Sequence, residues 1–176
     1  MGGVIIPCAH ITLLDQPLIF LAGPMKGAPL WQDDAIQYIL SQRSDIIVAS
    51  PRKGIRPAIE QHIFDGEHDY FSRTRAWERH YIELAACGSQ GGALLFWLPG
   101  EIEHHCDKSY GAMTRLELGQ WMTRYNRDSS IRLCIGTDGH FSEFETIAYD
   151  LSLDVPDKKV HRTLEETCRA ALDLIL

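Results

Sequence analysis

Short apolar runs alternate with amphipathic segments along this chain of 176 residues, and that alternation restricts the fold more than any other feature. Runs that are apolar almost throughout are typical of strands buried on both faces of a parallel sheet. The predicted strands cover residues 18–22 (LIFLA), 45–49 (DIIVA), 93–98 (ALLFWL) and 131–135 (IRLCI). Residues 4–6 add a fifth strand or only an N-terminal extension.

The segments between these strands carry apolar residues at helical spacing. The predicted helices cover residues 31–42, 71–86, 114–125 and 164–176. This alternation predicts a single α/β domain over residues 1–176, with an open parallel sheet of about five strands and helices on both faces. Ligands of such sheets bind beyond the carboxyl ends of the strands, so we expect the functional residues there.

Composition and charge narrow the class of partner. The chain is 45% hydrophobic and 23% charged, as in ordinary globular proteins, and its formal net charge is −7. An acidic chain is poorly suited to binding a nucleic-acid polymer or an anionic membrane surface through charge. We therefore expect a small-molecule substrate or a protein partner.

The cysteines and the N-terminus indicate the compartment. Five cysteines are dispersed without a CxxC pair, and the first residues lack the basic start of a signal peptide. The longest uncharged apolar runs are far shorter than the roughly 20 residues of a membrane helix. These features predict a cytoplasmic protein with reduced thiols and no membrane association.

Common cofactor and catalytic motifs are missing from the sequence. It contains no GxGxxG after a strand, no GxxxxGK[ST] and no GxSxG. Residues 101–107 (EIEHHCD) have the side chains of a metal site, but not the spacing of a zinc site, so they predict a solvated polar loop. We expect neither a metal nor a cofactor.

Glu117 is the most informative carboxylate. It follows Thr114 by three residues near the start of a predicted helix, a spacing that fits a capping box. The same position puts Glu117 in the first helical turn at the strand-end crevice, where the helix dipole favours an ionised carboxylate. Covalent glycosyl chemistry needs such a carboxylate, so the residues alone leave both roles open.

Other positions have a structural and a functional interpretation. Gly23 follows the first central strand, where a glycine permits either positive φ or a close backbone approach. Arg52 follows the second central strand and could bind an anion or a carboxylate, and residues 52–70 are long enough to form a site wall. By spacing alone, Trp77 belongs to the core and Glu78 to the surface.

Together these segments resemble the nucleoside 2-deoxyribosyltransferase-like family. The resemblance covers about residues 18 to 136, and its specificity lies in the combination of motifs. The matching motifs are IFLAGPM (residues 19–25), SPRK (50–53), FSRTRAWERHYIELA (71–85), ALLFWLPGE (93–101) and MTRLELGQW (113–121).

This resemblance implies a flavodoxin-like fold and cleavage of the N-glycosidic bond of deoxynucleosides, with transfer of the 2-deoxyribosyl group to an acceptor base. It implies that Glu117, at the ELG position, attacks the anomeric carbon and forms a covalent glycosyl-enzyme. The substrate-binding residues that it implies are Gly23, Pro24, Arg52, Trp77, Glu78, Tyr110 and Thr114.

The resemblance also implies a homo-oligomer in which a neighbour completes the pocket, with residues 150–176 reaching a partner or covering an edge. Trp77 or Trp97 is a candidate for the base-binding side, because aromatic faces stack on bases. Core packing is the alternative for both tryptophans.

Three positions depart from the family pattern. Gly111 stands where the transferases carry an aspartate that contacts the sugar, Gly91-Gly92 replaces an aspartate before the third central strand, and Thr74 replaces a glutamine. Two alternatives therefore remain beside the transferase. One is a nucleoside or nucleotide N-glycoside hydrolase with water as acceptor, and the other is a nucleoside-binding module without turnover.

Overall fold

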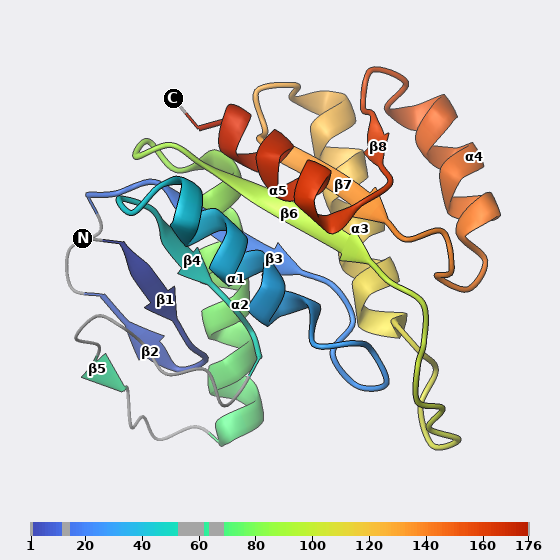
Figure 1. Cartoon of the computed structure of the whole chain (residues 1–176), viewed down its shortest axis with the longest axis horizontal. Helices are drawn as coiled ribbons and strands as arrows, with labels where there is room; N and C mark the ends of the chain where they lie inside the picture. Colours follow the sequence, from blue (N-terminus) through green and yellow to red (C-terminus); the bar gives the residue numbers. More distant parts are fainter. Residues whose placement is uncertain (1, 12–14, 53–61, 64–68, 176) are drawn as a thin grey trace.

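The computed structural model describes residues 2–11, 15–52, 62–63 and 69–175. Within them, six strands form a parallel sheet in the order β1-β4-β3-β6-β7-β8 (Figure 1). The strands are β1 (Gly3–Ile5), β3 (Leu18–Ala22), β4 (Ile47–Ala49), β6 (Gly92–Leu98), β7 (Leu133–Thr137) and β8 (Val160–His161). The order β4-β3-β6-β7-β8 is the 2-1-3-4-5 order of flavodoxin-like sheets, so the predicted fold class is confirmed.

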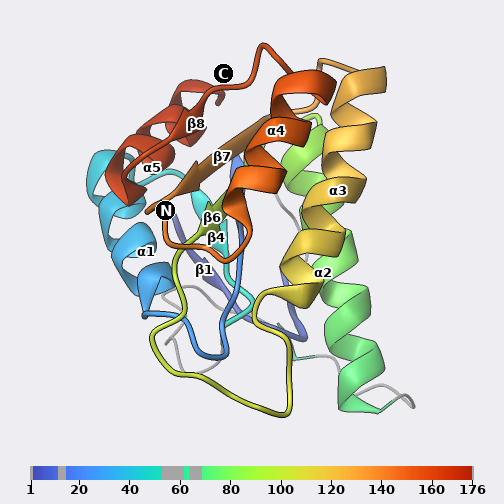
Figure 2. The same ribbon diagram turned by 90° about the vertical axis from the view of Figure 1, so that its right-hand side faces the viewer.

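Five helices cover the two faces of the sheet. Helices α1 (Trp31–Gln42) and α5 (Leu164–Asp173) lie on one face, and α2 (Tyr70–Cys87), α3 (Ala112–Arg127) and α4 (Phe144–Asp154) lie on the other (Figure 2). A separate two-stranded antiparallel pair joins β2 (Ala9–His10) to β5 (His62–Ile63). None of the described helices has the length and apolar character of a membrane span.

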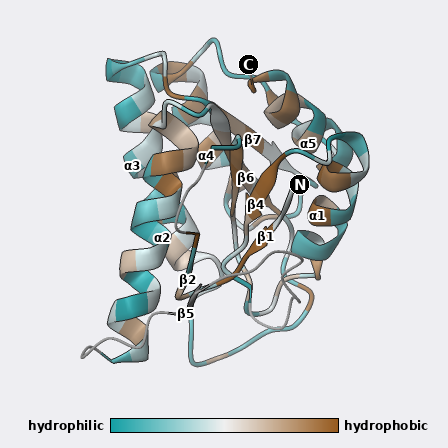
Figure 3. Ribbon diagram, turned by 90° about the vertical axis from the view of Figure 1, so that its left-hand side faces the viewer, coloured by the Kyte–Doolittle hydropathy of each residue, from teal (hydrophilic) through white to brown (hydrophobic). Residues whose placement is uncertain are grey.

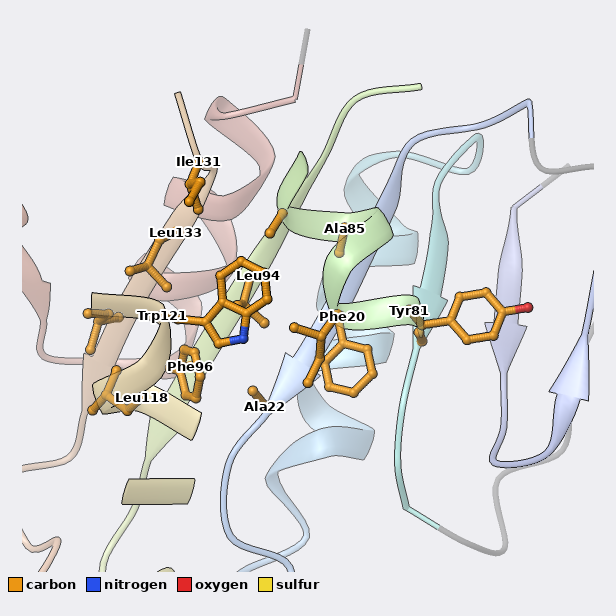
Figure 4. Packing of buried hydrophobic residues seen from close by; sticks show 14 of the residues in the cluster. Phe20, Ala22, Tyr81, Ala85, Leu94, Phe96, Leu118, Trp121, Ile131 and Leu133 are labelled. Carbon is orange, nitrogen blue, oxygen red and sulfur yellow. The ribbon is translucent and has the colours of Figure 1, made fainter. Parts of the chain in front are cut away.

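Side chains of the central strands alternate between two apolar cores, as the two-residue period of a strand requires. Phe20 and Phe96 belong to the core beneath α2 and α3, where Trp121 packs beside them (Figure 4). Ile19 and Leu95 belong to the core beneath α1 and α5. The strands are therefore apolar throughout, while the outer faces of the helices are largely hydrophilic (Figure 3).

Several elements differ from the prediction. The sheet gains β8, which pairs with β7 at an edge, and residues 150–176 thus supply an edge strand and the helix α5. Helix α4 and the pair β2–β5 are also additions. The predicted loop of residues 52–70 lies largely outside the described residues.

Helix α3 begins two residues earlier than predicted. Its N-cap is Gly111, whose φ of 63° lies in the left-handed region that glycine adopts easily. A Cβ atom at Gly111 would lie 2.7 Å from the Phe141 ring. Glycine is thus required at this position, and the helix starts without a side-chain cap.

Candidate active site

The site lies at the topological switch point of the sheet, where β3 and β6 are neighbours and their connections leave in opposite directions. The register pairs Ala22 with Phe96, so the loops after both strands begin at one edge, next to the first turn of α3 (Figure 2). Gly23 lies at this junction, and a Cβ atom there would be 2.4 Å from the Trp97 carbonyl oxygen and 2.6 Å from the Trp31 ring. Close packing, not positive φ, therefore requires this glycine.

A cavity of about 200 Å³, which we call the carboxylate cavity, opens at this edge beneath α2 and α3. Its lining residues are Phe20, Ala22, Gly23, Met25, Pro51, Phe71, Thr74, Arg75, Glu78, Ile82, Met113, Thr114 and Glu117. The predicted residues Gly23, Glu78, Thr114 and Glu117 are thus brought together in one cavity.

Arg75 joins the two carboxylates of this cavity. Its Nη1 donates a hydrogen bond of 3.0 Å to Oε1 of Glu117 and a second hydrogen bond to Oε2 of Glu78. The side chains are largely buried, with 16% of Glu117, 12% of Glu78 and 30% of Arg75 exposed. Because one nitrogen bonds both acids, their accepting oxygens lie within about 6 Å of each other.

Helix geometry explains how α2 supplies its half of the cavity. Phe71, Arg75, Glu78 and Ile82 follow one another at intervals of four, three and four residues, and Thr74 adjoins Arg75, so the five share one stripe of the helix. The N-cap of this helix, Asp69, accepts a hydrogen bond of 3.0 Å from the Ser72 amide and fixes the first turn.

Glu117 comes from the second turn of α3, since the helix begins at Ala112. The predicted capping box is therefore wrong, as is the placement of Glu117 in the first turn. Oε1 of Glu117 faces Arg75 from the other helix, and Oε2 makes no hydrogen bond to the described residues. A carboxylate oxygen is thus left for a ligand in the cavity.

Burial has the largest influence on the pKa of Glu78. Desolvation raises the pKa of this carboxyl above its usual value, the positive charge of Arg75 opposes the shift, and the charge of Glu117 adds to it. A carboxyl group whose pKa is raised by burial is suited to act as a general acid.

A second cavity, of about 380 Å³, adjoins the first along Gly23, Met25, Met113 and Thr114. We call it the loop cavity, because the loops after β3 and β6 form most of its wall. Its remaining lining residues are Pro24, Lys26, Glu101, His105, Lys108, Ser109, Tyr110, Gly111 and Ala112. The Tyr110 hydroxyl donates to the Pro99 carbonyl at 2.9 Å, which braces this wall.

The two tryptophans proposed for the base-binding side are core residues. Trp77 is 1% exposed, its indole nitrogen donates to the Ala9 carbonyl at 2.7 Å, and its ring packs against Phe20 and Tyr81. Trp97 is 5% exposed and packs beneath α1 and α5. Neither lines the carboxylate or the loop cavity, so the core-packing alternative holds for both.

Two other predicted contacts have internal partners. Arg52 forms an ion pair with Asp33 of α1 and lines neither cavity. Arg52 thus binds a carboxylate of the protein itself. The Pro24 carbonyl accepts a hydrogen bond of 2.9 Å from the Trp31 indole while Pro24 lines the loop cavity.

Sequence reasoning missed Arg75 and Phe71, although both stand in the segment that carries the resemblance. Their spacing from Glu78, at three and seven residues, was the available signal, because those intervals place all three on one helix face. Residues 101–107 form a loop, as predicted, and all of them except His105 are exposed. No group of three His, Cys, Asp or Glu side chains in the described part of the chain is arranged to hold a metal ion.

Comparison with known proteins adds no relative: neither a scan against protein-family models nor a search of curated proteins gives a match to this chain. The family resemblance therefore stays a prediction from motifs, and we infer the function from the geometry of the site.

Proposed function

We propose that this protein cleaves the N-glycosidic bond of a nucleoside and transfers the 2-deoxyribosyl group to an acceptor base, with Glu117 as the nucleophile. The observation that carries the proposal is the pair of carboxylates on one Arg75 nitrogen, inside a cavity at the switch point of the sheet. Retaining glycosidases hold their two carboxyl groups about 5–5.5 Å apart, and the shared nitrogen keeps the two accepting oxygens here within about 6 Å of each other, which is compatible with that spacing.

In the first step, Oε2 of Glu117 attacks the anomeric carbon as the bond from that carbon to the base nitrogen breaks. The departing base takes the bonding electrons and receives a proton from Glu78, whose raised pKa favours the protonated acid. Arg75 is a positioning residue, because it holds the other Glu117 oxygen and the Glu78 carboxylate in a fixed relation.

In the second step, an acceptor attacks the anomeric carbon and releases the Glu117 carboxylate. Glu78, now ionised, accepts the proton that the acceptor loses. A free base as acceptor gives transfer and water gives hydrolysis, so one active site serves both reactions.

A nucleoside-binding module without turnover is the second candidate, and Gly111 is the observation that favours it. The left-handed φ of Gly111 and its contact distance to Phe141 leave no room for the family's sugar-binding aspartate. Sugar recognition must therefore differ from that of the transferases.

The test is incubation of the pure protein with 2′-deoxynucleosides, with and without an added free base, followed by chromatography. If the protein transfers the sugar between bases, a new nucleoside should form only when the second base is present. Base release without an acceptor would instead assign hydrolysis, and binding without either product would assign the module.

The assembly expected from the resemblance is at least a dimer. Light scattering at micromolar concentration tests it directly, and a monomer at that concentration would contradict it.

A further inference from the structure

Three exposed apolar side chains from three different elements surround the mouth of the carboxylate cavity. Phe71 of α2 is 73% exposed, Met113 of α3 is 49% exposed, and Met25 of the loop after β3 is 46% exposed. The described residues include nine large hydrophobic side chains that are exposed to this degree, and three of them line this one small cavity. Apolar groups gathered beside buried charges are typical of a ligand site.

Phe71 is the aromatic residue of this cavity whose ring is available. Phe20 also lines the cavity but is 2% exposed and belongs to the core, and Trp77 is enclosed. Methionine side chains are flexible and polarizable, so Met25 and Met113 can adapt to the edges of a flat ring.

From this arrangement we infer that Phe71 stacks on the leaving base and that Met25 and Met113 enclose its edges. The inference rests on the proposed function, which makes a planar heterocycle the group that departs from the anomeric carbon. A phenyl face suits every base, because each base presents a π-face. Phe71 would thus bind the base without donating or accepting a hydrogen bond.

The position of Phe71 on α2 predicts which part of the base it contacts. Phe71 and Glu78 are seven residues apart on one stripe, so their Cα atoms are separated by about 10 Å along the helix. Glu78 serves the nitrogen at the glycosidic bond, and Phe71 therefore lies over the outer edge of the base. A two-ring purine extends further toward Phe71 than a one-ring pyrimidine does. The affinity for a purine should therefore depend more on Phe71 than the affinity for a pyrimidine.

The experiment is calorimetric titration of the wild-type protein with adenine and with cytosine, two free bases that have no glycosidic bond. The variants are Phe71→Ala and Phe71→Trp, and Tyr149→Ala is the matched control, because Tyr149 is a 65% exposed aromatic residue on α4 that lines neither cavity. We expect Phe71→Ala to weaken adenine binding about tenfold and cytosine binding less, Phe71→Trp to preserve both, and Tyr149→Ala to change neither. Thermal melting of each variant verifies folding, which exposed side chains should not alter.

Equal adenine affinity in wild type and Phe71→Ala, or no binding of either base by wild type, would overturn the inference. The experiment distinguishes a failure of this inference from a failure of the proposed function. Base binding that depends on Phe71 in a protein without turnover keeps the stacking role and refutes the reaction. Turnover of deoxyadenosine with an unchanged KM in Phe71→Ala keeps the reaction and refutes the stacking role.

Discussion

The carboxylate cavity and the loop cavity share four lining residues but differ in how their charged groups are held. In the carboxylate cavity, Glu78, Arg75 and Glu117 stand on two long helices and are largely buried. In the loop cavity, the lining residue Lys26 pairs with Asp107 outside the cavity, and these two side chains are 46% and 64% exposed. Solvent screens exposed pairs, whereas side chains on packed helices keep their geometry. We therefore propose that the chemistry takes place in the smaller cavity and that the larger one holds the rest of the substrate.

Glu117→Gln should have the largest effect, because it removes the nucleophile and keeps the side chain's shape. We expect base release to fall by a factor on the order of 10⁴ or more. The free energy of unfolding should change by only about 1 kcal/mol, since the amide oxygen still accepts from Arg75. Chromatographic assays and denaturant melts measure the two quantities. An active Glu117→Gln protein would show that the carboxylate cavity is not the reaction centre.

Glu78→Gln should lower activity by a factor of about 10²–10⁴, the usual contribution of a general acid. Because the pKa of Glu78 is raised, its acid form is lost as pH rises through that value, and the wild-type rate should fall with it. The variant should lack this alkaline limb. Pre-steady-state rates of base release across pH give the comparison, and an identical limb in both proteins would assign it to another group.

The same raised pKa predicts how the stability of the folded protein depends on pH. Folded Glu78 keeps a proton that the unfolded chain releases above its ordinary pKa of 4.5. The contribution of Glu78 to the unfolding free energy should therefore be largest below that pH and decline as pH rises through the folded pKa. Glu78→Gln should remove this decline, and urea melts across pH measure it.

Trp77→Leu should act on stability and leave the chemistry alone. Truncating a buried tryptophan leaves a cavity, and it also removes the hydrogen bond to Ala9, so we expect a loss of about 3 kcal/mol. The affinity for substrate of the folded fraction should not change. Weaker substrate binding at unchanged stability would instead show that Trp77 is a substrate-binding residue.

Lys108→Ala should have the smallest effect, below about twofold on kcat/KM, because an exposed lysine in the loop cavity is screened by water. A tenfold loss would instead show that the larger cavity binds an anionic part of the substrate. Assays at low and high salt show whether such a loss comes from a charge contact, since only a charge contact weakens with salt.

The sequence was sufficient to predict the central fold, because its signals there are local. Strand β3 and helix α1 have the predicted bounds: the strand is a uniformly apolar run that ends just before Gly23, and the helix has a clear amphipathic face. Strand β8 has two half-buried residues, and α4 buries only Phe144 and Leu151, so neither has a strong period. Strand β8 and helix α4 therefore depend on contacts with the rest of the fold more than on a local sequence pattern.

The candidate site could be predicted only in part. Glu117 was identified from its motif and its place after β6, but its partner Arg75 is 42 residues away in the chain. The start of α3 was misplaced because Thr114 matches a cap by type, while the left-handed Gly111 begins the helix two residues earlier. Local patterns thus singled out Glu117 as a candidate, and tertiary packing determines which side chains surround it.

The most direct test of the account is to capture the covalent intermediate. The Glu78→Gln variant should be quenched in acid during turnover of a 2′-deoxynucleoside whose base departs without needing a proton, and then examined by mass spectrometry. With such a substrate the first step does not need Glu78, while loss of the base that assists the second step slows release of the glycosyl-enzyme, so the intermediate accumulates. The account predicts a mass increase of one deoxyribosyl group, located on Glu117 and missing from the Glu78→Gln/Glu117→Gln protein. An adduct on another residue, or one that persists without the Glu117 carboxylate, would contradict it.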